Sequence, residues 1–187
     1  KTIKLARDFG LAGLGLVEHT GQLYFDNETF WYGRFMDAGV DTYVGCDRRM
    51  DTYFARARAA GVRPEYIGLE VDCDFYGRPV LEAADREQAG YLIGAMHWLP
   101  GLRERDKNLD RATVEFLGML DQFAASGIQI LAHPFRVFHR AGIEPTPELI
   151  NATVRILARH NLAAELNFHS QEPSPLLLEA CLKAGVK

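Results

Sequence analysis

Residues 66–72, YIGLEVD, decide the fold class of this chain. This short apolar run predicts a strand, and Gly77 marks a turn into a short partner strand around residues 80–81. A glutamate, Glu70, stands inside the apolar run. Burying a carboxylate without a partner costs several kcal/mol, so a glutamate at this position favours a cation nearby.

Similar strand-and-helix patterns lie before and after this strand in the sequence. Short apolar runs alternate with amphipathic helical patterns, which is typical of a parallel sheet covered by helices. A closed barrel and an open doubly wound sheet both fit this alternation. We expect further strands at residues 14–17, 91–96, 128–132 and 163–166, and helices at residues 1–11, 50–61, 109–125, 146–160 and 174–184.

The composition is that of one ordinary globular domain. The chain has 187 residues, of which 48% are hydrophobic and 25% are charged. It has no apolar run long enough to span a membrane and no signal peptide pattern. Three widely spaced cysteines, Cys46, Cys73 and Cys181, indicate reduced thiols and a cytoplasmic protein. The net charge of −4 argues against nucleic acid as the main partner, although bound divalent metals would add positive charge.

Histidines follow three of the predicted strands. His19 follows GLGLVE, His97 follows YLIGAM and His133 follows IQILA, and Glu70 lies within its own strand. In parallel α/β folds the carboxyl ends of the strands form the edge where active sites are built. A single histidine at a strand end is more often a hydrogen-bonded structural residue. Four such residues on one edge instead predict a metal site, and neutral imidazoles with a carboxylate suit zinc, manganese or iron rather than calcium.

Further polar residues near this edge are candidates for binding a substrate. Arg136, three residues after His133, could hold a phosphate group through two hydrogen bonds, or form a surface salt bridge. Asn167 and His169 follow the strand at residues 163–166 and share one face by the period of two residues. We expect them to contact the substrate or the metal ligands.

An aromatic cluster follows His19 in the sequence. It could form a lid or pocket wall, but packing beneath a long loop is the favoured interpretation. Its members are Tyr24, Phe25, Trp31 and Tyr32.

Five segments resemble, in order, the polymerase-and-histidinol-phosphatase (PHP) superfamily, and especially its histidinol-phosphatase-like members. This resemblance covers essentially the whole chain, and the ordered set is more specific than any single segment. The segments are GLVEHT (residues 15–20), YIGLEVD (66–72), YLIGAMHWL (91–99), ILAHPFR (130–136) and AELNFH (164–169).

The resemblance implies a distorted (β/α)7 barrel that holds a cluster of up to three divalent metals. His19 would be the histidine ligand that follows the second strand of that barrel. Glu70 would bridge two metals, and His97 and His133 would join it around a common metal. The family pattern also includes an H-x-H strand at its start and an Asp-x-His on its last strand, and this sequence contains neither. We therefore expect residues 1–187 to be a single PHP domain that is incomplete at both ends, trimmed from a longer parent, with a degenerate family member as the alternative.

The function that the resemblance implies is hydrolysis of a phosphate monoester of a small metabolite, with histidinol phosphate as one candidate. Metals would polarise the phosphate and activate a water, so that no protein nucleophile is required. The sequence has no G-x-S-x-G elbow and no P-loop, which argues against serine hydrolases and P-loop NTPases. The alternatives are a phosphodiesterase or exonuclease of the same superfamily and a non-catalytic barrel with a degenerate metal site. This segment by itself can be inactive.

Overall fold

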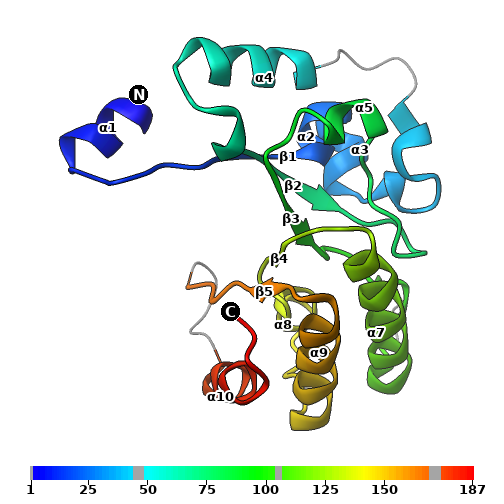
Figure 1. Ribbon diagram of the computed structural model, residues 1–187. Helices are drawn as coiled ribbons and strands as arrows, with labels where there is room; N and C mark the ends of the chain where they lie inside the picture. The colour runs from blue at the N-terminus through cyan, green and yellow to red at the C-terminus, as the bar shows by residue number, and fades with distance from the viewer. Residues whose placement is uncertain (1, 44–48, 104–106, 169–173) are drawn as a thin grey trace.

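The computed structural model describes residues 2–43, 49–103, 107–168 and 174–187. Its centre is one parallel sheet of five strands, which lie side by side in chain order (Figure 1). The predicted α/β class with a parallel sheet is therefore confirmed. The strands are β1 (Leu16–His19), β2 (Ile67–Asp72), β3 (Tyr91–Ala95), β4 (Ile130–Leu131) and β5 (Ala163–Ala164).

The strand order distinguishes between the two architectures that the sequence left open. Each strand pairs with the next one along the chain, which gives the order β1-β2-β3-β4-β5. A doubly wound sheet would instead reverse its direction of growth at a switch point. Because crossovers between parallel strands are almost always right-handed, a sheet that grows at one edge keeps its crossover helices on one face, as barrels do. The order is compatible with a barrel-like fold, and closure by seven strands stays a prediction.

The long helices lie at their predicted positions. The Thr146 side chain accepts a hydrogen bond from the backbone N–H of Leu149 and so caps the start of α9. Gly185 ends α10 with a φ of 71°, a conformation that glycine adopts without strain. No described helix is both long and apolar enough to cross a bilayer. These helices are α4 (Arg49–Ala59), α7 (Leu109–Ala125), α9 (Pro147–His160) and α10 (Pro175–Ala184).

Shorter helical elements surround the sheet. Figure 1 shows α2, α3, α4 and α5 around β1 and β2, whereas α7, α9 and α10 lie around β4 and β5. The α-helical elements are α1 (Thr2–Asp8), α2 (Thr20–Tyr24), α3 (Asn27–Trp31), α5 (Ala83–Arg86), α6 (Pro100–Arg103) and α8 (Arg136–Arg140). The 3-10 elements are η1 (Arg34–Met36), η2 (Gly39–Tyr43) and η3 (Pro64–Tyr66).

The partner strand predicted around residues 80–81 is wrong. In its place the structure has a single antiparallel bridge, formed by Pro79. The Asp74 carboxylate accepts hydrogen bonds from the backbone N–H groups of Tyr76 and Arg78, and these bonds bend the chain into a tight turn. The N–H of Val80 still donates to the carbonyl of Asp72, but the pairing ends there, because the N–H of Glu82 donates to the hydroxyl of Tyr24 instead.

Three other strands differ from the prediction in position or length. The first was expected at residues 14–17, but β1 begins at Leu16 and ends at His19, so this histidine belongs to the strand itself. Both β4 and β5 are shorter than predicted. Single hydrogen bonds nevertheless extend the pairing, from the N–H of Ala132 to the carbonyl of Gly94 and from the N–H of Glu165 to the carbonyl of Leu131.

The two faces of β2 have different neighbours. Ile67, Leu69 and Val71 are fully buried in the hydrophobic core of the molecule. Successive side chains of a strand point to opposite faces, so Glu70 and Asp72 share the other face. The pleat of β2 thus places two carboxylates beside each other and away from the core helices.

Candidate metal centre

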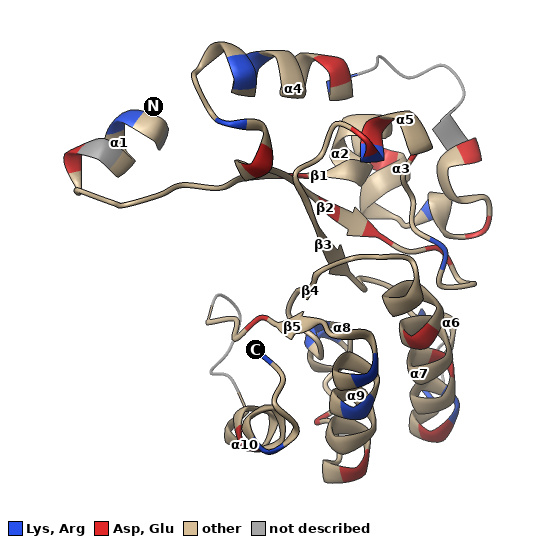
Figure 2. Ribbon diagram, in the orientation of Figure 1, with Lys and Arg blue, Asp and Glu red and all other residues tan. Residues whose placement is uncertain are grey.

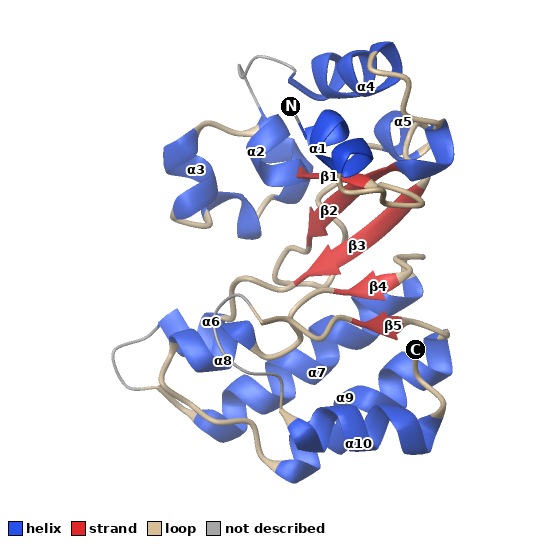
Figure 3. Cartoon of the chain, turned by 90° about the vertical axis from the view of Figure 1, so that its left-hand side faces the viewer, coloured by secondary structure: helices blue, strands red, loops and turns tan. Residues whose placement is uncertain are grey.

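The four predicted metal ligands meet at the carboxyl edge of the sheet. His19 is the last residue of β1 and lies opposite Glu70 in the register of β1 and β2. His97 follows the end of β3, and His133 follows the end of β4. Because neighbouring parallel strands end at the same edge, these side chains come together there. Figure 3 shows the arrowheads of β2 to β5 pointing toward the side on which α3, α6 and α8 lie.

Glu70 is at the centre of this group. Its Oε1 atom lies 3.5 Å from His19 Nδ1, 3.8 Å from His97 Nε2 and 3.4 Å from His133 Nε2. These distances exceed the roughly 2.7–3.2 Å of ordinary N–H···O hydrogen bonds. Two donor atoms that each lie about 2.0–2.1 Å from one ion are separated by roughly 2.9–3.4 Å. The spacing is therefore closer to that of ligands around a cation than to that of direct hydrogen bonds.

Three of the four residues form the most compact set. The donor atoms of His19, Glu70 and His97 all lie within 4.8 Å of one another, so this set could hold a metal ion. Nδ1 of His19 and Nδ1 of His133 are buried and have no hydrogen-bond partner in the described part of the chain. Buried polar atoms normally have a partner, and Nδ1 of His19, which faces the Glu70 carboxylate, fits a nitrogen that binds a cation. His133 faces Glu70 with its Nε2 instead, so its Nδ1 points away from the carboxylate. His133 lies outside the compact set but contacts it, because its Nε2 lies 3.4 Å from Oε1 of Glu70.

Asp72 is a functional residue that the sequence analysis missed. Its side chain is 1% exposed, and its Oδ1 accepts a hydrogen bond of 2.6 Å from Nδ1 of His97. With the Nδ1–H donated to Asp72, the other nitrogen of His97 keeps its lone pair and faces Glu70. A carboxylate behind a histidine ligand fixes the orientation of the imidazole and increases its basicity. The i+2 spacing from Glu70 was the available signal, since it puts both carboxylates on one face of β2.

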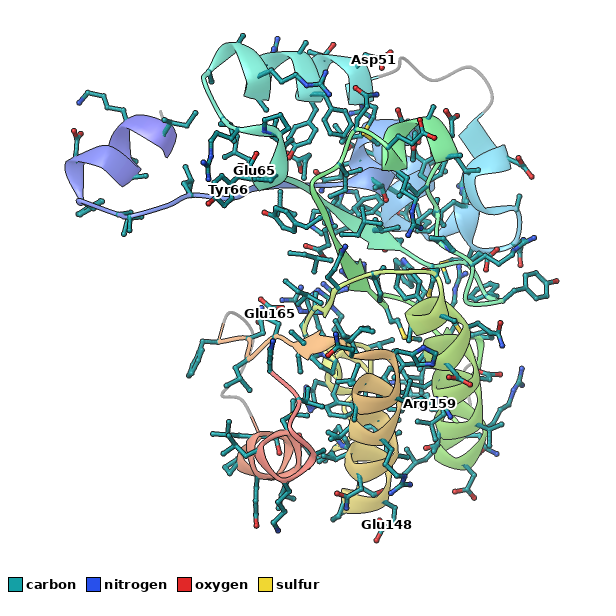
Figure 4. All side chains as sticks on the ribbon, viewed as in Figure 1. Asp51, Glu65, Tyr66, Glu148, Arg159 and Glu165 are labelled. Carbon is teal, nitrogen blue, oxygen red and sulfur yellow. The ribbon has the colours of Figure 1, made fainter. Side chains whose placement is uncertain are left out.

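A second missed carboxylate, Glu165, supports His133. The backbone φ of His133 is 31°, an uncommon conformation for a residue other than glycine. Oε2 of Glu165 accepts a hydrogen bond of 2.8 Å from the backbone N–H of His133 and so stabilises this conformation. Figure 4 shows Glu165 next to the β5 segment.

Two of the predicted substrate-binding residues, Asn167 and Arg136, are linked to Glu165 by hydrogen bonds. The Asn167 amide donates a hydrogen bond of 2.9 Å to Glu165, and its oxygen accepts one of 3.2 Å from the guanidinium of Arg136. Asn167 therefore links the support of His133 to Arg136, and its contact with a substrate stays a prediction. Nε of Arg136 is buried and has no hydrogen-bond partner in the described residues. His169 lies outside the described residues.

The electrostatics favour a charged carboxylate beside a neutral His133. Burial opposes the ionisation of Glu70, but the 3.4 Å contact with His133 Nε2 and the positive charge that the three histidines carry when protonated outweigh it, so the pKa of Glu70 is lowered. Burial lowers the pKa of His133 in spite of its contact with Glu70. At neutral pH Glu70 is thus ionised and His133 is uncharged, which are the states that bind a divalent metal.

A cavity of about 840 Å³ opens from the site. Trp31 lines it and is 57% exposed, whereas Tyr24 and Phe25 are buried. The favoured interpretation of the aromatic cluster as packing therefore holds for Tyr24 and Phe25, and Trp31 is a wall of the cavity. The lining residues are His19, Phe30, Trp31, His97, Trp98, Leu99, Leu102, Arg103, Lys107, Arg136, Val137, Arg140 and Ala141.

Neither a comparison with models of protein families nor a comparison with curated proteins finds a match to this chain. The resemblance to the PHP superfamily rests on the ordered motifs and is neither supported nor contradicted by these comparisons. What the geometry shows independently is a five-stranded parallel sheet whose carboxyl edge gathers a His19–Glu70–His97 group that could hold a metal ion.

Proposed function

We propose that this chain is a large part of a metal-dependent phosphoesterase of the PHP type, which hydrolyses a phosphate monoester of a small metabolite. The observation that carries the proposal is the Glu70-centred group, which lies beside a cavity that Arg136 also lines. The distorted seven-stranded barrel is part of the same proposal. In it, β1 to β5 would be consecutive strands, because they follow one another in space as they do in sequence.

The residues of the chain have separate roles in this proposal. The cation is held by His19, Glu70 and His97, and His133 contacts Glu70 beside them. Asp72 keeps His97 in the orientation that leaves one ring nitrogen free to bind the cation. A divalent zinc, manganese or iron ion bound there supplies Lewis acidity and activates a water for attack on phosphorus. Chain residues hold these groups before the substrate arrives, so little reorganisation is needed during the reaction.

Arg136 is placed to bind the phosphate group of the substrate. It lines the same cavity as His19 and His97, and its contact with Asn167 directs the guanidinium. A guanidinium can donate two parallel hydrogen bonds to phosphate oxygens and offset charge that develops on them. The described lining residues include no serine, threonine or cysteine, so water is the nucleophile that this cavity favours.

The first experiment is the measurement of metal content. Protein purified without chelator or added metal is analysed by elemental mass spectrometry, beside a His97→Ala/His133→Ala double variant. We expect about one equivalent of a transition metal in the unsubstituted chain and little in the double variant, since it loses two of the four donor residues. A panel of phosphate monoesters is then screened with the metal-loaded protein.

Three results would count against the proposal. A folded chain, by circular dichroism, that binds no zinc, manganese or iron would reject the metal site. A metal-loaded chain that hydrolyses no monoester would reject activity of residues 1–187 by themselves and favour the alternative of a non-catalytic module. Steeply salt-dependent binding of DNA would favour the nuclease alternative, because contacts with a phosphate backbone weaken strongly as salt rises.

A further inference from the structure

The cavity beside the metal centre is lined by positive charge. Its described lining includes four cationic side chains, Arg103, Lys107, Arg136 and Arg140, and no aspartate or glutamate. The chain as a whole carries a net charge of −4, and residues of both signs are spread over its elements (Figure 2). The cavity therefore gathers positive charge, although the chain as a whole is negatively charged.

Two of these cations lie on one helix. Arg136 and Arg140 are one turn apart on α8, and like charges at this spacing destabilise a helix unless an anion binds between or beside them. Burial, followed by the nearby charge of Arg140, lowers the pKa of Arg136. Glu165 and Glu70 offset part of the charge of Arg136, but neither arginine forms an ion pair with a carboxylate within the described residues.

The other two cations approach from the α6 side. Arg103 donates a hydrogen bond of 3.0 Å to the carbonyl of Tyr32, and its guanidinium lies 5.5 Å from the centre of the Trp98 ring. Lys107 donates a hydrogen bond of 2.7 Å to the carbonyl of Ala141. Both contacts hold the side chains at the cavity without neutralising them, because a carbonyl carries no net charge. A cleft lined by one sign of charge attracts ligands of the opposite sign.

The size of the cavity leaves room beyond a phosphate group. Its volume of about 840 Å³ lies in the range of roughly 300–1,000 Å³ that holds whole small molecules. Phe30 and the half-exposed Trp31 supply an aromatic wall between the metal centre and solvent. A leaving group with an apolar or planar body fits this wall, and its far end then meets Arg103, Lys107 or Arg140.

We propose that the substrate carries a second negative charge on its leaving group, as a carboxylate, sulfonate or further phosphate. This inference rests on the proposed phosphoesterase function and narrows its substrate class. One cation, Arg136, serves the phosphate that reacts, and the remaining three serve the second anion. The phosphate of an amino alcohol, such as histidinol phosphate, would instead bring its ammonium group toward positive charge and bind weakly.

The test uses three ligands of matched shape: benzylphosphonate, 4-carboxybenzylphosphonate and 4-(aminomethyl)benzylphosphonate. Their affinities for the metal-loaded protein are measured by calorimetry, which requires no turnover. We expect the carboxylate to bind about tenfold more tightly than the neutral ligand, as one charge-assisted hydrogen bond provides, and the amine to bind most weakly. Hydrolysis of the three corresponding phosphate esters is measured separately.

Substitutions in the cavity test whether its cations cause this ranking of affinities. Arg140→Gln and Lys107→Gln should each weaken the preference for the carboxylate, and the triple variant that adds Arg103→Gln should abolish it, while the affinity for benzylphosphonate falls less. The matched control is Arg155→Gln, which changes an exposed arginine of α9 outside the cavity.

The outcomes separate this inference from the proposed function. Equal affinities, tightest binding of the amine, or a carboxylate preference that survives the triple variant would overturn it. Tighter, salt-sensitive binding of a single-stranded oligonucleotide that depends on Lys107 and Arg140 would also overturn it and assign the surface to nucleic acid. If the ranking holds but no ester is hydrolysed, the anion-binding cavity stands and phosphoesterase activity of residues 1–187 by themselves is rejected.

Discussion

The two halves of the candidate site are built differently. On one side, β2 and β3 have six and five residues, and the regular pleat of β2 places Glu70 and Asp72 on one face. On the other side, β4 and β5 have two residues each. There, His133 adopts a positive φ, and a hydrogen bond from its backbone to Glu165 supports it.

The difference shows two ways of holding a ligand. In the first half, strand register fixes the position of the backbone, and a buried carboxylate only has to orient one imidazole ring. In the second half the backbone itself departs from strand geometry, so a side chain has to hold it. Substitutions in the first half should therefore act on metal binding directly, and those in the second half should act through the placement of His133.

The largest effect is expected for Glu70→Gln. Glutamine keeps the size of the side chain but removes the charge that three imidazoles surround. We expect metal affinity to fall by more than about a hundredfold, beyond the range typical of residues that only support ligands. Calorimetric titration with zinc or manganese measures this loss. Glu65→Gln makes the same chemical change at an exposed residue of η3, before the start of β2, and should leave the affinity unaltered (Figure 4).

Asp72→Asn should have the next largest effect. An amide in place of the carboxylate weakens the hydrogen bond that orients His97, and we expect metal affinity to fall about ten- to hundredfold. Asp74→Asn is the matched control, because Asp74 is equally buried but bonds to the turn at residues 76–78. It should lower the free energy of unfolding without changing metal affinity. Equal losses of affinity in the two variants would show that Asp72 acts only through stability.

The sequence was sufficient to place the first half of the site. Apolar runs predicted β2 and β3, and the residues at their ends follow from the rule that parallel strands present functional groups at their carboxyl edge. The long helices were also predictable, because signals such as Thr146 and Gly185 act within a few residues. Their effect does not depend on the rest of the fold.

The remaining features depend on contacts between distant segments. The bond between Asp72 and His97 joins two strands whose relative register no local pattern reveals. Glu165 and His133 are 32 residues apart, and their contact depends on how the chain leaves two very short strands. The partner strand predicted at residues 80–81 stops after one bridge because the N–H of Glu82 donates to the hydroxyl of Tyr24, a residue 58 positions away.

Glu165→Ala tests the second half of the site and should have a smaller effect. Without the carboxylate the N–H of His133 loses its acceptor, and the imidazole is no longer held near Glu70. One hydrogen bond of this kind corresponds to about a three- to tenfold loss of metal affinity. Glu148→Ala, at an exposed position at the start of α9, is the control (Figure 4). A loss larger than that of Asp72→Asn would mean that metal affinity depends more on the support of His133 than on the support of His97.

The smallest effects are expected in the pH dependence of stability without metal. Burial lowers the pKa of His133 below its ordinary 6.5. Burial opposes ionisation of Glu70, but its histidine neighbours outweigh this and lower its pKa below the ordinary 4.5. Just below each ordinary value the unfolded chain binds more protons than the folded chain. The free energy of unfolding therefore falls as pH falls, by at most about 1.4 kcal/mol per pH unit for each proton.

The two halves should lose stability in different windows, which urea denaturation of the metal-free protein can resolve. The loss that begins below pH 6.5 is shared by His133 and His139, whose pKa burial also lowers, and should become smaller in His133→Gln. The further loss that begins below pH 4.5 includes the contribution of Glu70 and should be reduced in Glu70→Gln. If the upper loss is unchanged in His133→Gln, His133 is not held neutral by burial. The second half of the site would then be open to solvent without metal. The two halves would differ in how well their side chains are ordered as well as in their backbone geometry.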